Sequence, residues 1–466
     1  MASLPLSTSR RLLATLIMAG PTFGLLAMGW GFLDSYRSQR AWEKHRAAAV
    51  ARGVEYDFTR FAPAPVPDEK NFAATPFFRE LLSADEAAQK EMAERLKLHP
   101  ADEATTLPSD RLKAVRRYDA LLDEISRAAK RPAAVFPLRY DQLGLLSLPH
   151  ALPLIRLAQL YQFRSKALLA NGLPEEAAAD LLTLFRLAKH GGAHDPIVIM
   201  NLVETTLFSY AMEIYWEGLI SRQWPDATLL QVQARLQDFD FLLNGQKAYQ
   251  GARADYVSQV ELILRSPSEA KIKAQPLYDE AYQKIARAKP FKGWVYQNLM
   301  HGDHLFEKHL IASLDPAARR VAPKEEKIIQ RWFERATRTS DASRLLAASV
   351  SIPLQGSARR FAYAQTVADL GVVATALERY HRRGNSYPET LAALVPTFLE
   401  ALPHDLVTGE PLHYRRTENG RFLLYSVGWN GTDDGGRTFF SKQKRRFFTL
   451  PKGDWIWPLP DESSEL

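Results

Sequence analysis

An uncharged stretch near the N-terminus constrains the fold of this chain more than any other feature. Residues 12–33 (LLATLIMAGPTFGLLAMGWGFL) contain no charged side chain, and a helix needs about 20 apolar residues to cross the hydrocarbon core of a bilayer. A cleaved signal peptide is the alternative, but its apolar core would be shorter, about 7–15 residues. No small-residue cleavage site is evident after the stretch. The sequence therefore predicts a retained transmembrane helix over 12–33, with residues 1–11 as its N-terminal flank.

Composition narrows the chemistry of the rest of the chain. Among 466 residues there is no cysteine, which excludes disulfides, zinc-thiolate sites and cysteine nucleophiles. Hydrophobic residues make up 46% and charged residues 24%, which are values typical of globular proteins rather than disordered ones. The net charge of +7 fits an anionic membrane surface as well as it fits nucleic acid.

The region after the apolar stretch divides into a linker and a helical body. Residues 34–70 are charged and helix-compatible at first and end in a proline-rich spacer, Phe61 to Pro67. Residues 71–350 show the helical period of apolar residues, so we expect an all-α body. Within it, residues 161–190 look like one helix-turn-helix of the tetratricopeptide kind, with Gly172 in the turn. No second copy follows, so an ordinary antiparallel helix pair is the favoured interpretation.

One histidine-rich segment of the body has the composition of a metal site. On a helix, His301 and His304 share a face, and Glu307 lies one turn further on. Two imidazoles and a carboxylate can bind a transition metal, as in a membrane-anchored metallohydrolase. The segment is polar on most sides, however, and a solvated surface helix is the interpretation that we favour.

Other polar residues of the body predict structural roles. Glu213 and Glu217 are four residues apart in an apolar helix that also contains Glu204, and we expect them to pair with cations of neighbouring helices. The basic stretch from Arg319 to Arg338 is diluted by glutamates and is typical of an exposed helical face. There is no G-x-S-x-G, P-loop or dinucleotide fingerprint, so we predict no enzyme activity.

The last hundred residues carry the most specific pattern. A helical apolar face ends near Gly384, which suits the cap of that helix, and Pro388 fits the first turn of a short second helix. That short helix should turn Leu391, Leu394 and Val395 inward. Strands over 412–415 and 422–427 are predicted across Asn419-Gly420, because Asn-Gly favours a tight hairpin turn. The positions on the first helical face are Val367, Leu370, Val373, Ala374, Leu377 and Tyr380.

This ordered set resembles the C-terminal globular domain of the major pseudopilins of type II secretion systems. The match covers residues 360–458, with 459–466 as a tail. The segments that carry it are the helix ending in Tyr380, Tyr387-Pro388, Leu402-Pro403-x-Asp405, Gly409-x-Pro411-Leu412, Tyr425-Ser426-Val427-Gly428-x-Asn430, Asp433-Asp434-Gly435-Gly436, and Asp454 with Trp457.

The resemblance implies a calcium site in the loop after the second strand. Its ligands would be the oxygens of Asn430, Asp433, Asp434 and Asp454, with glycines that let the backbone wrap the ion. An Asp-Gly turn without an ion is the alternative. The chain departs from the family in having Leu406 where proline is usual, and in placing the domain far from the N-terminus.

Taken together, the sequence predicts a mainly α protein: a transmembrane helix, an all-α body and a small α+β C-terminal domain with a short antiparallel sheet. We expect a non-catalytic docking or structural protein of the bacterial inner membrane, with lipid and other envelope proteins as partners and no small-molecule substrate. Basic residues after the apolar stretch favour a cytoplasmic body, whereas the resemblance favours the periplasm, which we adopt. A nucleic-acid-binding component acting through Lys444 to Arg446 is a further alternative.

Overall fold

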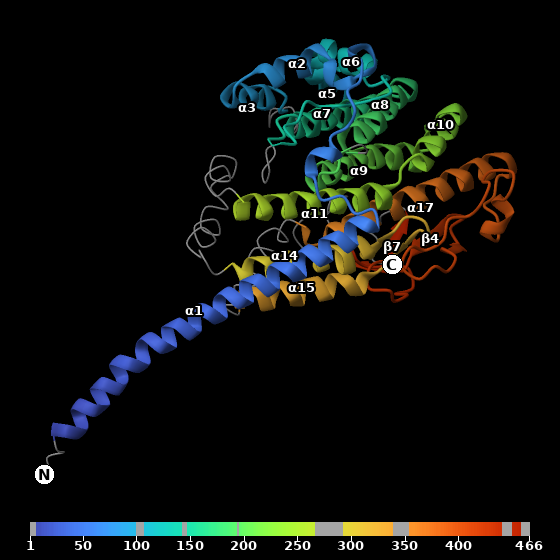
Figure 1. Ribbon diagram of the computed structural model, residues 1–466. Helices are drawn as coiled ribbons and strands as arrows, with labels where there is room; N and C mark the ends of the chain where they lie inside the picture. The colour runs from blue at the N-terminus through green and yellow to red at the C-terminus, as the bar shows by residue number, and fades with distance from the viewer. Residues whose placement is uncertain are drawn as a thin grey trace, which may run out of the picture.

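The computed structural model describes residues 6–98, 107–141, 147–192, 195–265, 292–338, 354–439 and 450–457, without the side chains of 6–24, 27, 263, 336–338 and 439. The described chain is mainly helical, with a small antiparallel sheet in its C-terminal region (Figure 1). This confirms the predicted fold class in its coarse form.

The N-terminal helix α1 (Leu6–Ala51) is one element of 46 residues, so the predicted flank is not separate from it. Its N-terminal half extends away from the rest of the molecule, and its C-terminal half lies along α14 (Gly293–Leu305) (Figure 1). The predicted span 12–33 falls in α1, but most of its side chains lie outside the described ones. Among the residues that are described, no helix is long and apolar enough to cross a membrane, so the structure does not support this prediction.

A group of short helices packs on one end of the body. The predicted helix pair is confirmed as α7 and α8, and the turn between them places Gly172 at φ +73°, where glycine has no steric penalty. Of the short helices, α3 and α5 pack on α7, and α8 joins the pair to α9 at the centre of the molecule. The elements are α2 (Pro76–Ser83), α3 (Glu86–Arg95), α5 (Pro108–Val115), α6 (Asp119–Ala128), α7 (Ala151–Ala170) and α8 (Pro174–Gly192).

The centre of the molecule is α9 (Val198–Ile220), which is apolar on nearly all sides and buried by neighbours on several faces. It contacts α7, α8, α11 and α17. The remaining helices of this part are α10 (Asp226–Gln237), α11 (Phe241–Arg265), α14 and α15 (Pro323–Arg338).

The prediction that the body is all-α is wrong at one point. Two short strands, β1 (Leu314–Asp315) and β2 (Arg320–Val321), pair antiparallel between α14 and α15. The Asp315 carboxylate accepts the backbone N–H of Ala318, and Arg319 adopts φ +48°, so local turn chemistry interrupts the helical period here. Residues 266–291 and 339–350 of the predicted body lie outside the described residues.

The long helix α17 (Ser357–Gly384) begins the C-terminal part. Its cap differs from the predicted one, because Gly384 is still helical and Asn385 takes the left-handed conformation. A 3₁₀ turn then follows over Leu391–Leu394. With three residues per turn, Leu391 and Leu394 share its buried side, whereas Val395 is 37% exposed, contrary to the prediction.

The predicted hairpin is confirmed as β3 (His413–Arg416) and β4 (Phe422–Ser426), and β7 (Trp455–Trp457) adds a third antiparallel strand beside β4. Alternate residues of the sheet face α17: Leu424 is opposite Trp457, and Ser426 is opposite Trp455. A second small ribbon joins β5 (Thr438–Phe439) and β6 (Lys452–Gly453).

The two predicted domains share one core. α17 packs against α9, α10 and α11 on one side and against β4 and β7 on the other. Buried apolar residues form a continuous cluster from Trp42 on α1 to Trp457 among the described parts of the chain. The C-terminal unit is therefore packed into the helical body rather than displayed beside it.

Candidate functional site

The Asp/Gly loop after β4 is the region for which the sequence predicts a site. Residues 428–436 follow β4 and curl back over the segment that leads into β7. Gly428, Gly431, Gly435 and Gly436 all have positive φ. A side chain at Gly428 would collide with the carbonyl oxygen of Gly453, so only glycine allows this close approach.

The centre of this loop is the carboxylate of Asp454, which is fully buried. It accepts the backbone N–H of Asp434 at 3.1 Å and that of Gly436 at 2.7 Å. Burial raises the pKa of Asp454, and these two hydrogen bonds oppose that shift. The carboxylate thus holds the loop in place through backbone donors.

The other predicted ligands do not converge on Asp454. Asn430 donates its side-chain N–H to Asp434 at 2.9 Å, while Asp433 accepts from the Tyr425 hydroxyl at 3.1 Å and from the Gly435 N–H at 2.8 Å. That backbone hydrogen bond lowers the pKa of Asp433. Among the described residues of the loop, no three carboxylates lie within 4.8 Å of one another. Calcium binding stays a prediction.

A neighbouring aspartate that the sequence did not single out as a site organises the same region. Asp405 is buried and accepts the backbone N–H groups of Val407, Thr408 and Val427, at 2.8 to 2.9 Å. The Asp-x-x-Thr-Gly run was a usable signal, because aspartate caps the turn that follows it. Leu406, which replaces the usual proline, is buried, and its carbonyl accepts the N–H of Val321 from β2.

The histidine-rich segment proves to be a buried anchor point rather than a solvated surface helix. Asp303 on α14 has no exposed surface and accepts four hydrogen bonds. Two come from Arg253 on α11, at 2.6 and 2.9 Å. The others join it to Tyr56 at 2.9 Å and to His45 on α1 at 2.6 Å.

Electrostatics explain why this cluster is stable. Burial disfavours the charge on Asp303, but the hydrogen bonds and charge of Arg253 outweigh it and hold the pKa of Asp303 below its usual value. The Tyr56 pKa is raised by burial and by the nearby carboxylate. The cluster therefore ties α1, α11 and α14 together as a charged hydrogen-bond network.

The metal ligands proposed from the sequence are not brought together. Glu307 pairs with Arg52 at 3.2 Å, and His309 pairs with Glu325 at 2.7 Å. Burial lowers the pKa of His304, with His309 adding to the shift. Ligand atoms of His45, Asp303 and Glu307 lie within 4.8 Å of one another, but Asp303 already receives four donors and does not fit a metal ligand in this arrangement.

The glutamates of α9 have structural partners. Glu213 and Glu217 both lie near Lys166, at 3.6 and 3.7 Å. Glu204 is fully buried against Asn244, which donates to both of its oxygens, and burial raises its pKa to about 8.

Of the two basic segments singled out from the sequence, only the one from Arg319 to Arg338 is described by the structure. Arg319 is held by Asp369 of α17 at 2.7 Å, so this end of the stretch is structural rather than a free charged face. The alternative nucleic-acid segment, Lys444 to Arg446, lies outside the described residues.

The largest exposed apolar side chains gather on the projecting part of α1. Leu26 is 73% exposed and Trp30 is 70% exposed. Because successive helical residues are about 100° apart, these side chains point to several sides of the helix. The full set is Leu25, Leu26, Met28, Trp30, Phe32 and Leu33.

Comparisons with protein-family models, with curated proteins and with solved structures yielded no match for this chain.

Proposed function

We propose that this chain is a non-catalytic, single-pass protein of the bacterial cell envelope, anchored in the inner membrane through α1. The observation that carries the proposal is the exposed apolar surface of α1 between Leu25 and Leu33. It points to several sides of one helix, and a protein groove would cover only one of them, whereas lipid covers all. The uncharged sequence 12–33 extends this surface toward the N-terminus.

The attachment of α1 to the body supports its role as an anchor. Beyond the apolar segment, α1 packs along α14, where Ser35 accepts the N–H of Gly293 at 3.1 Å. Further along, His45 joins the Asp303 network. Because α1 is bonded to the body at both Ser35 and His45, it would hold the body in a fixed orientation relative to the membrane.

The resemblance of residues 360–458 to a pseudopilin domain supports a docking or structural role linked to secretion, with the body in the periplasm. Envelope proteins are the partners that this proposal favours.

Flotation with lipid vesicles tests the anchor. The full-length Leu26→Arg/Trp30→Asp variant should lose vesicle association, because two charges would enter the hydrocarbon core. Leu230→Arg is a matched control, since Leu230 is half exposed but lies on α10 of the body. Undiminished association of the double variant would refute the anchor. A C-terminal reporter fusion that is active only in the cytoplasm would refute the periplasmic placement.

Calcium binding to the Asp/Gly loop is the second part of the proposal. A ligand that binds only the folded state raises the unfolding midpoint. We expect calcium to raise the midpoint relative to chelator, and Asp434→Ala to abolish the rise. An unchanged midpoint would leave Asp433 and Asp434 as turn residues.

A further inference from the structure

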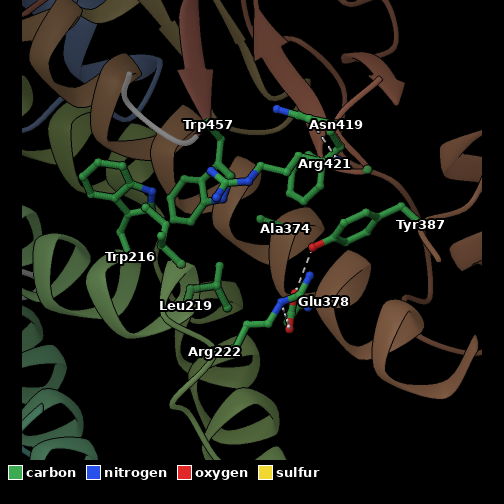
Figure 2. Close-up of a pocket in the computed structure, with 12 residues that line it drawn as sticks. Trp216, Leu219, Arg222, Ala374, Glu378, Tyr387, Asn419, Arg421 and Trp457 are labelled. Carbon is green, nitrogen blue, oxygen red and sulfur yellow. Dashed lines mark hydrogen bonds and ion pairs between the residues drawn. The ribbon is translucent and has the colours of Figure 1, made fainter. Parts of the chain in front are cut away.

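A cavity of about 410 Å³ lies where the helical body meets the C-terminal unit. It is bounded by the C-terminal end of α9, the middle of α17, the turn of the β3–β4 hairpin and the last residue of β7 (Figure 2). This volume is within the range of small-molecule sites in proteins. Exposed residues such as Ile220, Asn419 and Arg421 lie at its edge, so the cavity is accessible from solvent.

Aromatic rings form much of its wall. Trp216 and Trp457 lie on one side, Tyr387 lies on the other, and Phe422 completes the lining. These side chains come from four segments far apart in the sequence, which is why the sequence showed no small-molecule site. Rigid rings offer a large apolar contact area to a ligand at a small cost in side-chain entropy.

The charges around the cavity are unbalanced. Glu378 is buried and already satisfied: it accepts from the Tyr387 hydroxyl at 3.0 Å and lies 3.9 Å from Arg222 and 3.5 Å from Arg382. Arg421 reaches the cavity from the hairpin turn, and no acidic side chain in the described parts of the chain pairs with its guanidinium. The lining thus has two guanidinium groups, Arg222 and Arg421, and one carboxylate.

We propose that this cavity binds a carboxylate attached to an aromatic or similarly apolar group. The apolar group would lie among the rings of Trp216, Trp457 and Tyr387. The carboxylate would receive the forked N–H donors of Arg421, whose planar geometry matches two carboxylate oxygens. Such a ligand balances the charge of the lining and contacts the aromatic rings that form its wall.

Two sources can supply this chemistry. One is a free organic acid. The other is the chain itself, because residues 458–466 follow directly on Trp457 in the sequence and combine apolar Leu459 with acidic Asp461 and Glu462. The experiment needs an arm for each source.

Isothermal titration calorimetry of the full chain in detergent, with 2-naphthylacetate and its neutral amide as probes, tests the proposal. We expect the acid to bind at least tenfold more tightly than the amide. Arg421→Met should remove this preference, whereas Arg415→Met, an exposed arginine on the same hairpin, should retain it. Measurable binding of acid and amide with equal affinity, or an unchanged preference in Arg421→Met with an unchanged far-ultraviolet spectrum, would overturn the proposal.

Repeating the titration on a chain that ends at Trp457 separates the two sources. Equal affinity of the full and shortened chains for 2-naphthylacetate assigns the site to free acids. Binding only to the shortened chain assigns it to the chain's own carboxylates. Binding to neither chain would overturn the proposal.

Discussion

The helices α1 and α17 are both long, yet α17 buries polar residues whereas the projecting half of α1 exposes apolar ones. α17 buries nearly its whole length between the body and the sheet, including polar residues such as Asp369, Thr375 and Glu378. The projecting half of α1 instead exposes leucine, phenylalanine and tryptophan. The comparison teaches that hydropathy alone does not predict burial, since a helix is buried where specific partners satisfy its polar groups.

The largest expected effect comes from removing Asp303, whose hydrogen bonds join α1 to α11 and α14. Asp303→Ala should lower the free energy of unfolding by about 3–5 kcal/mol, because it leaves the Arg253 guanidinium buried without its partner. Thermal or denaturant unfolding measures the change. Asp238→Ala, at an exposed position, is the control and should change little. If the Arg253→Met/Asp303→Leu double variant were no more stable than Asp303→Ala, an unpaired charge would not explain the loss.

The next effect concerns Glu204 in the buried centre and depends on pH. Its folded-state pKa is raised to about 8 from a reference of 4.5, so the folded chain holds a proton that the unfolded chain releases. The stabilising contribution is fully present below about pH 4.5 and is lost as the pH rises toward 8.

Glu204→Gln removes this titration. We expect the variant to be more stable than the natural chain at pH 8, by an amount on the order of 1 kcal/mol or more, and the difference to shrink toward pH 5. Denaturant unfolding at both pH values is the measurement, with Glu389→Gln as an exposed control. A stability difference that did not change with pH would contradict the shifted pKa.

A smaller effect tests the polar contacts of α17. Thr375 and Tyr215 share a buried hydrogen bond of 2.6 Å, so Thr375→Val leaves the Tyr215 hydroxyl without that partner and should cost about 1–3 kcal/mol. The midpoint of thermal unfolding reports the loss, and exposed Thr432→Val is the control. Adding Tyr215→Phe should recover part of the stability; no recovery would assign the loss to packing.

The smallest effect is expected on the exposed face of α1. Leu26→Gln should change the unfolding free energy by less than about 0.5 kcal/mol, because its side chain has no buried contacts to lose. Trp42→Ala, on the same helix but buried, should cost several-fold more, about 3 kcal/mol. If thermal unfolding gave similar midpoints for the two variants, the C-terminal half of α1 would not be packed against the body as described.

The sequence predicted the elements better than it predicted their surroundings. The apolar period and turn residues located α7, α8, α17 and the β3–β4 hairpin, because these signals are local. Nothing in the sequence indicated the partners of the polar positions of α17, since these come from distant segments: Arg319 pairs with Asp369, and Tyr215 with Thr375.

The separation of partners along the chain also explains why the surroundings of the candidate sites could not be predicted. The sequence placed Asp303 in a polar surface helix, because Arg253, Tyr56 and His45 lie more than 45 positions away along the chain. In the Asp/Gly loop it located the aspartates and glycines. It could not indicate that the Asp454 oxygens would accept backbone N–H groups, since that depends on how the loop folds back.

The continuity of α1 has a mechanical consequence. At about 1.5 Å per residue, its 46 residues form one helix of roughly 70 Å, with no break before His45, which bonds to Asp303 of the body. If its first half crosses a bilayer, a change in bilayer thickness alters its tilt. The body would then swing as a lever arm about the membrane surface, so that bilayer thickness sets the height and direction at which its far end meets a partner.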